Sequence, residues 1–414
     1  MPKLLLIGLG LGDTKRYIVT DLLAGGYELI LLAEQIPDWA GPYLARVQRA
    51  GLRDFAAAAD TATALGRQHA VDAVFTCDEA YVELAALVAG RLGLPGLTAE
   101  AARLCRDKLA MRRRLAEAGI GSAASIVAAS RAQARLAAEQ IGYPVVLKPR
   151  NLGGSIGVVR ADCPADLDAL FDVPAEAVMS RVSPLSGLLV EEYLDGPEYS
   201  VESVITDGTT ITCGITEKVL GFAPFFEETG HFARPVDPGA EPDAQLIAIV
   251  AAVHKALEIG VGATHCEIRM TRSGPRVIEI AGRVGGDRIP AITRLATGVD
   301  LIGAAAAAAV GAPVTVRPSC QRVAGIRMIY PDADGVLVRR QARPDRAGLL
   351  ADLGWYVQPG QRVALPPRGF LSRLGYLVAV GATRQEVGRR LDAGQELLDI
   401  GIEPGTALAP AGAA

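Results

Sequence analysis

The sequence predicts an α/β protein of more than one domain, and three observations support that prediction. The chain has 414 residues, half of them apolar, which is more than one ordinary hydrophobic core holds. Residues 1–100 alternate apolar strand patterns with helical patterns, as expected for a parallel sheet with crossover helices. Further along, pairs of short strands flank glycine-rich or acidic turns, so we expect α+β character in the later parts.

Composition excludes several classes of partner and location. The formal net charge is −4 and there is no polybasic run, so we expect neither nucleic acid nor a membrane as a partner. The apolar start is too short for a signal peptide, and no apolar stretch reaches membrane-spanning length. The six cysteines lack CxxC spacing, which fits free thiols in a reducing compartment. We therefore expect a cytoplasmic protein.

The first domain has its strand candidates at residues 3–7, 27–32 and 73–77. A glycine-rich turn over residues 8–12 follows the first strand and resembles a dinucleotide-binding fingerprint. The second strand, however, has only Glu34 as an acidic candidate for a ribose contact. The turn is either an NAD site or, as we favour, the tight turn of a degenerate nucleotide-binding fold.

A strand ending at Lys148 leads into a glycine-rich loop and then into a second strand. The loop contains Gly153, Gly154, Ser155 and Gly157. A Walker loop would place its lysine after the glycines and continue into a helix, so this segment is different. Glycines let backbone N–H groups turn toward an anion, and the serine adds a donor. We expect phosphate binding, with a plain flexible hairpin as the alternative, and we expect Arg150 to face solvent.

Residues 188–204 are strand-like on both sides of a turn at residues 195–197, and we interpret them as a strand pair. Acidic residues interrupt its apolar pattern at Glu191, Glu192, Glu198 and Glu202. Strand alternation would turn Glu192 and Leu194 to one face. Glu198 would accept hydrogen bonds from ribose hydroxyls, while backbone groups would read adenine. The alternative is an edge strand with protective charges.

Two glutamates twelve positions apart, Glu267 and Glu279, flank a turn at residues 272–274. In a hairpin centred on Ser273 they would face each other, and like charges placed so are destabilising. A cation between the carboxylates would resolve the repulsion, and oxygen ligands few in number suit Mg²⁺. The alternative is a solvated hairpin with two unrelated acids.

The remaining pattern suggests three parts. Helices are expected over residues 105–118, 131–140, 243–259 and 384–399. Gly311 and Pro313 then interrupt the chain, and we expect the residues beyond them to form a separate small domain with a frayed end over residues 407–414. We therefore predict domains over residues 1–100, 101–312 (with a lid subdomain over about residues 122–188) and 313–414.

In this order, the signals at Lys108, Lys148, residues 191–194 and Glu267/Glu279 resemble those of the ATP-grasp superfamily, over roughly residues 1–310. The resemblance implies an ATP-grasp fold preceded by a parallel-sheet domain and followed by a small C-terminal domain. It implies that Lys108 and Lys148 hold the α and β phosphates while Ser155 and the backbone of residues 153–157, including Gly153, Gly154 and Gly157, close over the triphosphate.

The resemblance implies further roles for the acidic residues. Glu191, Glu192 and Leu194 would line the adenine, and Glu198 would bind the ribose. Glu267 and Glu279 would hold two Mg²⁺ ions, for which Mn²⁺ would be a substitute. Arg283 would bind the transferred phosphoryl group.

Within the superfamily, the sequence is similar to bacterial L-amino acid ligases. Many members have an asparagine ligand two residues after the second glutamate, where this chain has Ala281. The segment with Glu228 and His231 resembles a loop that meets the amino acid in those enzymes. His231 would orient a substrate carboxylate, act as a base, or be an ordinary loop histidine. Asp287 and Arg288 would bind an amino acid's charged groups or form a surface ion pair; His265 is expected to be structural.

The resemblance implies an ATP-dependent carboxylate–amine ligase that joins amino acids through an acyl phosphate and releases ADP and phosphate. One alternative is a carboxylase or formyltransferase relative that activates bicarbonate or formate. Another is a non-catalytic ATP-binding regulatory module. The expected partners are small carboxylates and amines, and a homodimer is a family expectation.

Overall fold

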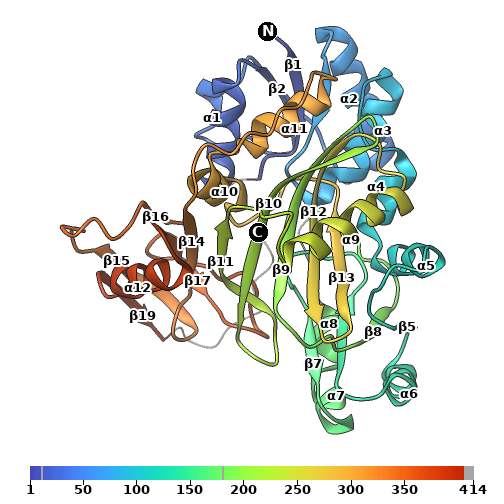
Figure 1. Cartoon of the computed structure of the whole chain (residues 1–414), viewed down its shortest axis with the longest axis vertical. Coiled ribbons are helices and arrows are strands. Elements are labelled where there is room, and N and C mark those ends of the chain that lie inside the picture. Colours follow the sequence, from blue (N-terminus) through green and yellow to red (C-terminus); the bar gives the residue numbers. More distant parts are fainter. Residues whose placement is uncertain (11–12, 180, 405–414) are drawn as a thin grey trace.

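The computed structural model describes residues 1–10, 13–179 and 181–404, which form a central body with three lobes (Figure 1). The upper lobe holds a parallel sheet in the order β3-β2-β1-β4. Its strands are β1 (Lys3–Ile7), β2 (Glu28–Ala33), β3 (Arg46–Arg49) and β4 (Ala73–Phe75). Its helices are α1 (Arg16–Ala24), α2 (Phe55–His69) and α3 (Val82–Leu92), with 3-10 turns η1 (Asp13–Lys15), η2 (Gly41–Tyr43) and η3 (Glu79–Tyr81).

Both faces of this parallel sheet are buried, which explains its continuous apolar strands. Leu4 and Leu6 of β1 pack on one face, whereas Leu5 and Ile7 pack on the other. The predicted crossover architecture is therefore confirmed. Strand β3 was not predicted, because all four of its residues are exposed and it therefore lacks the apolar pattern of a buried strand. Of the predicted glycine turn, residues 11 and 12 lie outside the described part of the chain.

The basic helix predicted over residues 105–118 is two helices, α4 (Ala99–Arg106) and α5 (Lys108–Glu117). Asp107 separates them and accepts a hydrogen bond from the backbone N–H of Leu109, at 3.0 Å. A side-chain acceptor of this kind starts a new helix at the expense of the old one. The break places Lys108 at the first position of α5.

The lower lobe, at the lower right of Figure 1, is an antiparallel sheet in the order β5-β8-β6-β7. Its elements are β5 (Ser125–Ala128), α6 (Arg131–Ile141), β6 (Val145–Pro149), β7 (Val159–Ala161), α7 (Pro164–Leu170), α8 (Asp172–Glu176) and β8 (Leu188–Glu192). The strand–loop–strand prediction around Lys148 is confirmed by β6 and β7. We call this lobe the lid.

The strand pair predicted over residues 188–204 is wrong, because β8 belongs to the lid and β9 (Glu198–Thr206) to the central sheet. Between them Gly196 has a φ of 136°. A Cβ there would approach the backbone oxygen of Met270 at 2.0 Å, so only glycine fits. Residues 193–197 are thus a crossing between two sheets rather than a hairpin turn.

The central sheet has eight strands in the order β13-β12-β9-β10-β11-β14-β18-β16, all antiparallel to their neighbours. Its further strands are β10 (Thr209–Gly221), β11 (Glu227–Arg234), β12 (Gly262–Thr271), β13 (Gly274–Ala281), β14 (Val323–Ile329), β16 (Asp352–Trp355) and β18 (Gly375–Gly381). Helices α9 (Asp243–Ala256), α10 (Ile289–Thr297) and α11 (Leu301–Ala309) accompany it.

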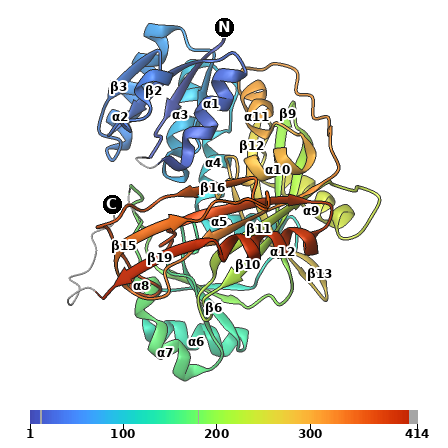
Figure 2. The same ribbon diagram turned by 90° about the vertical axis from the view of Figure 1, so that its left-hand side faces the viewer.

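The C-terminal part is not a separate unit, which corrects the prediction for residues 313–414. Strand β14 pairs with β11, so β14, β18 and β16 extend the central sheet. A three-stranded sheet of β15 (Gly335–Ala342), β17 (Arg362–Val363) and β19 (Leu398–Glu403) lies beside it, with α12 (Arg384–Gln395), in the left lobe of Figure 1 and facing the viewer in Figure 2. Helix α12 is shorter than predicted, and the predicted frayed end lies outside the described residues.

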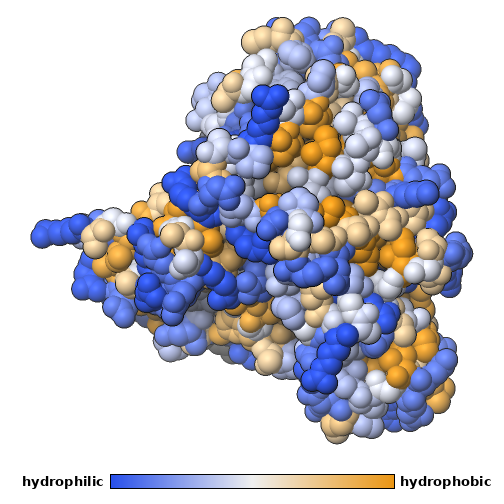
Figure 3. Space-filling model, viewed as in Figure 1, coloured by the Kyte–Doolittle hydropathy of each residue, from blue (hydrophilic) through white to orange (hydrophobic). Residues whose placement is uncertain are grey.

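None of the described helices is by itself long and apolar enough to cross a membrane; α10 and α11 would pass together, but they bend by 113°. On the face shown in Figure 3, hydrophilic residues separate small groups of apolar ones. All six cysteines are free thiols, as the sequence predicts.

Candidate active site

The two glutamates predicted to face each other do so: Glu267 of β12 is paired in register with Glu279 of β13. The strand pairing that brings them together differs from that of a simple hairpin centred on Ser273. Thr271 pairs with Gly274 across a two-residue turn, and the register shifts after Glu267. A bulge of one residue at Ile278 therefore restores the pairing of the two acids. Bulges are common where a side chain must be aimed at a site.

Each glutamate lies against a lysine. Glu279 Oε2 is 2.9 Å from Lys108 Nζ, and Glu267 Oε1 is 2.7 Å from Lys218 Nζ. Burial raises the pKa of both carboxyls, but the lysines outweigh it and lower the pKa of Glu267 to about 2. Two ionised carboxylates with adjacent free oxygens form a donor set of the kind that Mg²⁺ prefers.

His265 also holds Glu267 in place. Its Nε2 lies 3.1 Å from Glu267 Oε1 and its Nδ1 lies 2.5 Å from Glu202 Oε1. Burial alone would lower the pKa of His265, but Glu202 and Glu267 raise it to about 10. The imidazolium therefore orients Glu267 and has no lone pair to offer a metal, which fits the structural role expected for it.

A cavity lies between the lid and the central sheet. Among the residues predicted to bind the nucleotide, eight line it: Lys108, Lys148, Gly154, Ser155, Glu191, Glu192, Leu194 and Glu198. Both glutamates of the hairpin, Glu228 of β11 and apolar side chains including Phe226 and Ile278 complete the lining. Residues far apart in sequence thus converge on one cavity lined by apolar side chains and a few charged groups, as is usual for ligand sites.

The glycine-rich loop has the backbone that its sequence predicts. Gly154, Ser155 and Gly157 have φ values of 65°, 57° and 73°, in the left-handed region that favours glycine. Lys108 Nζ donates to the carbonyl of Leu152 at 2.7 Å. Arg150, expected to face solvent, instead pairs with Asp107 at 2.6 Å and donates to the carbonyl of Ser186 at 3.0 Å. It ties the base of the loop to the start of α5.

Glu191 lines the cavity as expected, but its carboxylate is bound by protein groups, and its contact with adenine stays a prediction. It lies 2.5 Å from Lys148 Nζ and 3.0 Å from Arg112 Nε, and it accepts from the hydroxyl of Ser125 at 2.7 Å. Burial lowers the pKa of Lys148 even though Glu191 opposes the shift. Glu191 therefore positions the lysine, whereas the exposed Glu192 lines the cavity and accepts from the backbone N–H of Ala124 at 3.3 Å.

Lys218 is a functional candidate that the sequence did not reveal. Its ammonium is buried among three carboxylates, at 2.7 Å from Glu267, 2.9 Å from Glu198 and 3.3 Å from Glu228. Glu198, predicted to bind ribose, also accepts from Arg269 Nε at 2.8 Å. A charged residue at an inward position of β10 was the available signal, but its partners lie on other strands.

Arg283 follows Glu279 by four residues and lies outside the lining of the large cavity. Its Nε is 2.6 Å from Glu79 Oε2, and its Nη1 donates to the carbonyl of Val284 at 2.8 Å. Burial raises the pKa of Glu79, but Arg283 and Arg106 lower it to about 2. Arg283 is also the charged residue among those that line a second cavity, between the upper lobe and the body. Its contact with a phosphoryl group stays a prediction.

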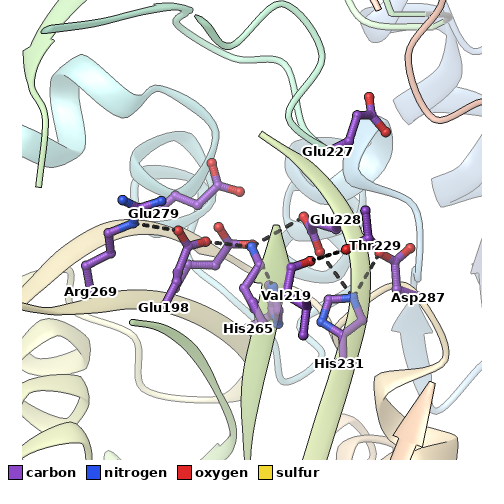
Figure 4. A network of polar contacts seen from close by, with 12 residues as sticks. Glu198, Val219, Glu227, Glu228, Thr229, His231, His265, Arg269, Glu279 and Asp287 are labelled. Carbon is purple, nitrogen blue, oxygen red and sulfur yellow. Dashed lines mark hydrogen bonds and ion pairs between the residues drawn. The ribbon is translucent and has the colours of Figure 1, made fainter. Parts of the chain in front are cut away.

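A second polar cluster lies on β11 and on the turn after β13 (Figure 4). His231 Nε2 is 3.2 Å from Asp287 Oδ2 and 3.3 Å from Glu228 Oε2. The segment from Glu227 to His231, expected as a loop, is the first half of strand β11. Burial raises the pKa of Glu228.

Asp287 and Arg288 do not form the ion pair with each other that the sequence left open; among the described ion pairs, each has a different partner. Asp287 pairs with Arg373 of the C-terminal part. Arg288 Nη2 is 3.0 Å from Asp352, and its guanidinium lies over the ring of Tyr376 at 4.4 Å. Arg373 had no sequence signal because its partner is 86 positions away.

Comparison with known proteins gives a consistent result. A model of the ATP-grasp domain matches residues 141–291, and a model of the ATP-grasp N-terminal domain matches residues 24–96. An uncharacterized protein of Sinorhizobium fredii, y4rH, is 32% identical over 347 residues, which are 82% of this chain and 70% of that protein. The alanine–anticapsin ligase of Bacillus subtilis is 32% identical over 256 residues, 56% of this chain and 52% of that enzyme.

The chain thus spans about half the length of that ligase. Among solved structures, the L-amino acid ligase from Bacillus licheniformis superimposes with a TM-score of 0.80, covering 97% of this chain and 99% of that one at 23% identity. At this level of identity the likeness shows the fold.

Proposed function

The chain belongs to the ATP-grasp superfamily, and from this premise we propose that it is an ATP-dependent carboxylate–amine ligase that joins amino acids. The observation that carries the proposal is the pairing of Glu267 and Glu279 at one end of a cavity that also contains Lys108 and Lys148. The similarity to amide-forming ligases supports this reaction over bicarbonate or formate activation.

In this proposal the triphosphate lies under the glycine-rich loop, between Lys108 and Lys148. Glu267 and Glu279 would hold Mg²⁺, which supplies charge neutralisation on the γ-phosphate. Ala281 offers no side-chain oxygen, so a second ion would have fewer protein ligands. The adenine would lie against Leu194 and the backbone after β8, with the ribose near Glu198.

The reaction would proceed in two steps. A carboxylate oxygen of the first amino acid attacks the γ-phosphorus and ADP leaves, which forms an acyl phosphate. The neutral amine of the second amino acid then attacks the acyl carbon and phosphate leaves. The protein contributes mainly positioning and charge stabilisation, because phosphoryl transfer offers side chains little covalent work. Closure of the lid would exclude water and so prevent hydrolysis of the acyl phosphate.

The attacking amine must lose a proton, and the geometry favours Glu228 over His231 as its acceptor. His231 Nε2 faces two carboxylate oxygens, a setting that keeps a proton on this nitrogen. Its other nitrogen is buried, with no hydrogen-bond partner among the described residues. Glu228 lines the cavity and has a raised pKa, as a general base requires. His231 would orient the carboxylates on either side of it.

A direct assay tests the proposal. Purified protein would be incubated with Mg-ATP and pooled amino acids, with ADP and phosphate release measured and products identified by mass spectrometry. We expect release that depends on amino acids, and a product whose mass equals two amino acids minus water. ADP release driven by bicarbonate or formate alone would favour the carboxylase or formyltransferase reading. ATP binding without turnover on any acceptor would support the regulatory reading.

A further inference from the structure

Residues 369–373 of the C-terminal part, which we call the bridging segment, contact the acidic residues at the start of β11 and Asp287. The segment's last residue, Arg373, has a side chain that is 9% exposed. The guanidinium pairs with Asp287 Oδ1, and Nε donates to the hydroxyl of Tyr330 at 3.1 Å. A third contact runs to the carbonyl of Glu228 at 3.4 Å. This buried cation plays no part in the reaction described above.

Arg373 holds Asp287 in an unfavourable backbone conformation. Asp287 and Arg288 have φ values of 50° and 60°, and consecutive non-glycine residues in this region are strained. Such strain persists only where the surroundings fix it. The guanidinium takes one carboxylate oxygen of Asp287 and leaves the other, Oδ2, directed to His231 and Glu228.

The cluster around Oδ2 is suited to a cationic group. Glu228, His231 and Asp287 offer oxygen and nitrogen atoms within 4.8 Å of one another. Glu227 adds a third carboxylate nearby, bound to Tyr330 at 2.6 Å. Arg373 is the main cation that balances these carboxylates, because Lys218 is shared with two further glutamates, Glu198 and Glu267. Carboxylates therefore exceed cations here, and an added positive charge would be favourable.

We propose that Arg373 is a positioning residue that fixes Asp287 so that its Oδ2 receives the ammonium group of the amino acid that donates the carboxylate. The inference rests on the proposed ligase function. The ammonium is assigned to the carboxylate donor because the second amino acid must attack as a neutral amine. The C-terminal part thereby completes the amino acid site.

Loss of Arg373 would release Asp287 from its strained position and leave it next to Glu228 without a counterion. A hydrogen bond to a charged group contributes roughly 1.5–3 kcal/mol, which corresponds to about a 10- to 150-fold change in binding. We expect Arg373→Gln to raise the KM of the donor amino acid in this range. The KM of ATP should not change, because neither Arg373 nor Asp287 lines the cavity that contains Lys108 and Lys148.

The test compares Arg373→Gln and Arg373→Lys with Arg368→Gln, a control in which an exposed arginine loses its partner Asp334. Steady-state kinetics are measured for the donor amino acid, for the same acid without its amino group, and for ATP. Wild type and control should prefer the amino acid. Arg373→Gln should lose most of this preference. Arg373→Lys keeps the charge but lacks the planar guanidinium with its several donors, so its preference should lie between those of wild type and Arg373→Gln.

Two results would overturn the inference. One is a donor KM within twofold of wild type in a folded Arg373→Gln protein. The other is a parallel rise in the KM of ATP and of the donor, which indicates a general structural defect. If Arg373→Gln does not fold, the same criteria apply to Arg373→Lys. A wild-type protein with no amino-acid-dependent turnover would instead refute the proposed function itself.

Discussion

Replacing Glu279 by glutamine tests the metal site most directly, because the structure predicts different effects on activity and on folding. The side chain is 23% exposed and, among the described ion pairs, its partner is Lys108, which keeps its bond to the carbonyl of Leu152. An isosteric amide should therefore cost about 1 kcal/mol of folding stability. Loss of one carboxylate charge at the proposed Mg²⁺ site should lower turnover by roughly 10²–10³-fold, by analogy with a preorganised donor to a developing charge.

Glu267→Gln is the matched variant. It should lower turnover to a similar extent, but it also removes the acceptor of two buried cations, Lys218 and His265. Breaking a buried ion pair from one side typically costs about 3–5 kcal/mol. Glu267→Gln should therefore lose more stability than Glu279→Gln, because Glu267 binds two cations in the described ion pairs and Glu279 binds one.

The assay combines ADP release at graded Mg²⁺ concentrations with urea unfolding of both variants. We expect Glu279→Gln to require more Mg²⁺ and to keep the urea midpoint near that of wild type, whereas Glu267→Gln shifts both. Retention of more than a tenth of wild-type turnover by Glu279→Gln at ordinary Mg²⁺ would refute the metal assignment. Equal stability losses would refute the account of the ion pairs.

Three further outcomes are expected. Glu191→Gln should destabilise the fold by roughly 3 kcal/mol and weaken ATP binding, because it leaves Lys148 buried without its counterion; unchanged urea unfolding would contradict this. Gly154→Ala forces φ = 65° on an alanine, which costs about 1–2 kcal/mol of conformational energy, so turnover should fall several-fold. The control Gly119→Ala, where φ is 69° and no atom lies near the added Cβ, should leave turnover unchanged. Burial lowers the pKa of His254 to about 4, below its unfolded value of about 6.5. The free energy of unfolding should therefore fall by roughly 3 kcal/mol as the pH drops from 6.5 to 4. In urea unfolding, His254→Asn should not show this contribution to the loss of stability at low pH.

Sequence patterns predicted those parts of the site that are formed within one short segment of the chain. The spacing of Glu267 and Glu279 and the glycines after Lys148 act within one hairpin or one loop, so periodicity and turn chemistry reveal them. Lys218 and Arg373 were missed, since their partners lie on other strands and no sequence period marks an ion pair across a sheet. The ion pair between Glu191 and Arg112, 79 positions away, could not be predicted for the same reason.

The same limit explains the errors in the fold. Strand β14 looks like any short apolar strand, and nothing within it indicates that its partner is β11. The break at Asp107 followed from a single side-chain hydrogen bond that competes with a continuous basic helix. Pairing between distant segments is decided by the whole sheet, whereas the sequence displays only each segment's own preferences.

Leu371 lies two residues before Arg373, and its backbone N–H donates to Glu227 at 3.2 Å. A Cβ on Gly154 of the glycine-rich loop would be 2.9 Å from its side chain. The element that shapes amino acid recognition therefore also borders the cover of the triphosphate. Over evolutionary time, exchange of this short stretch would change substrate preference and the timing of closure together, while the strands that carry the metal ligands stay as they are.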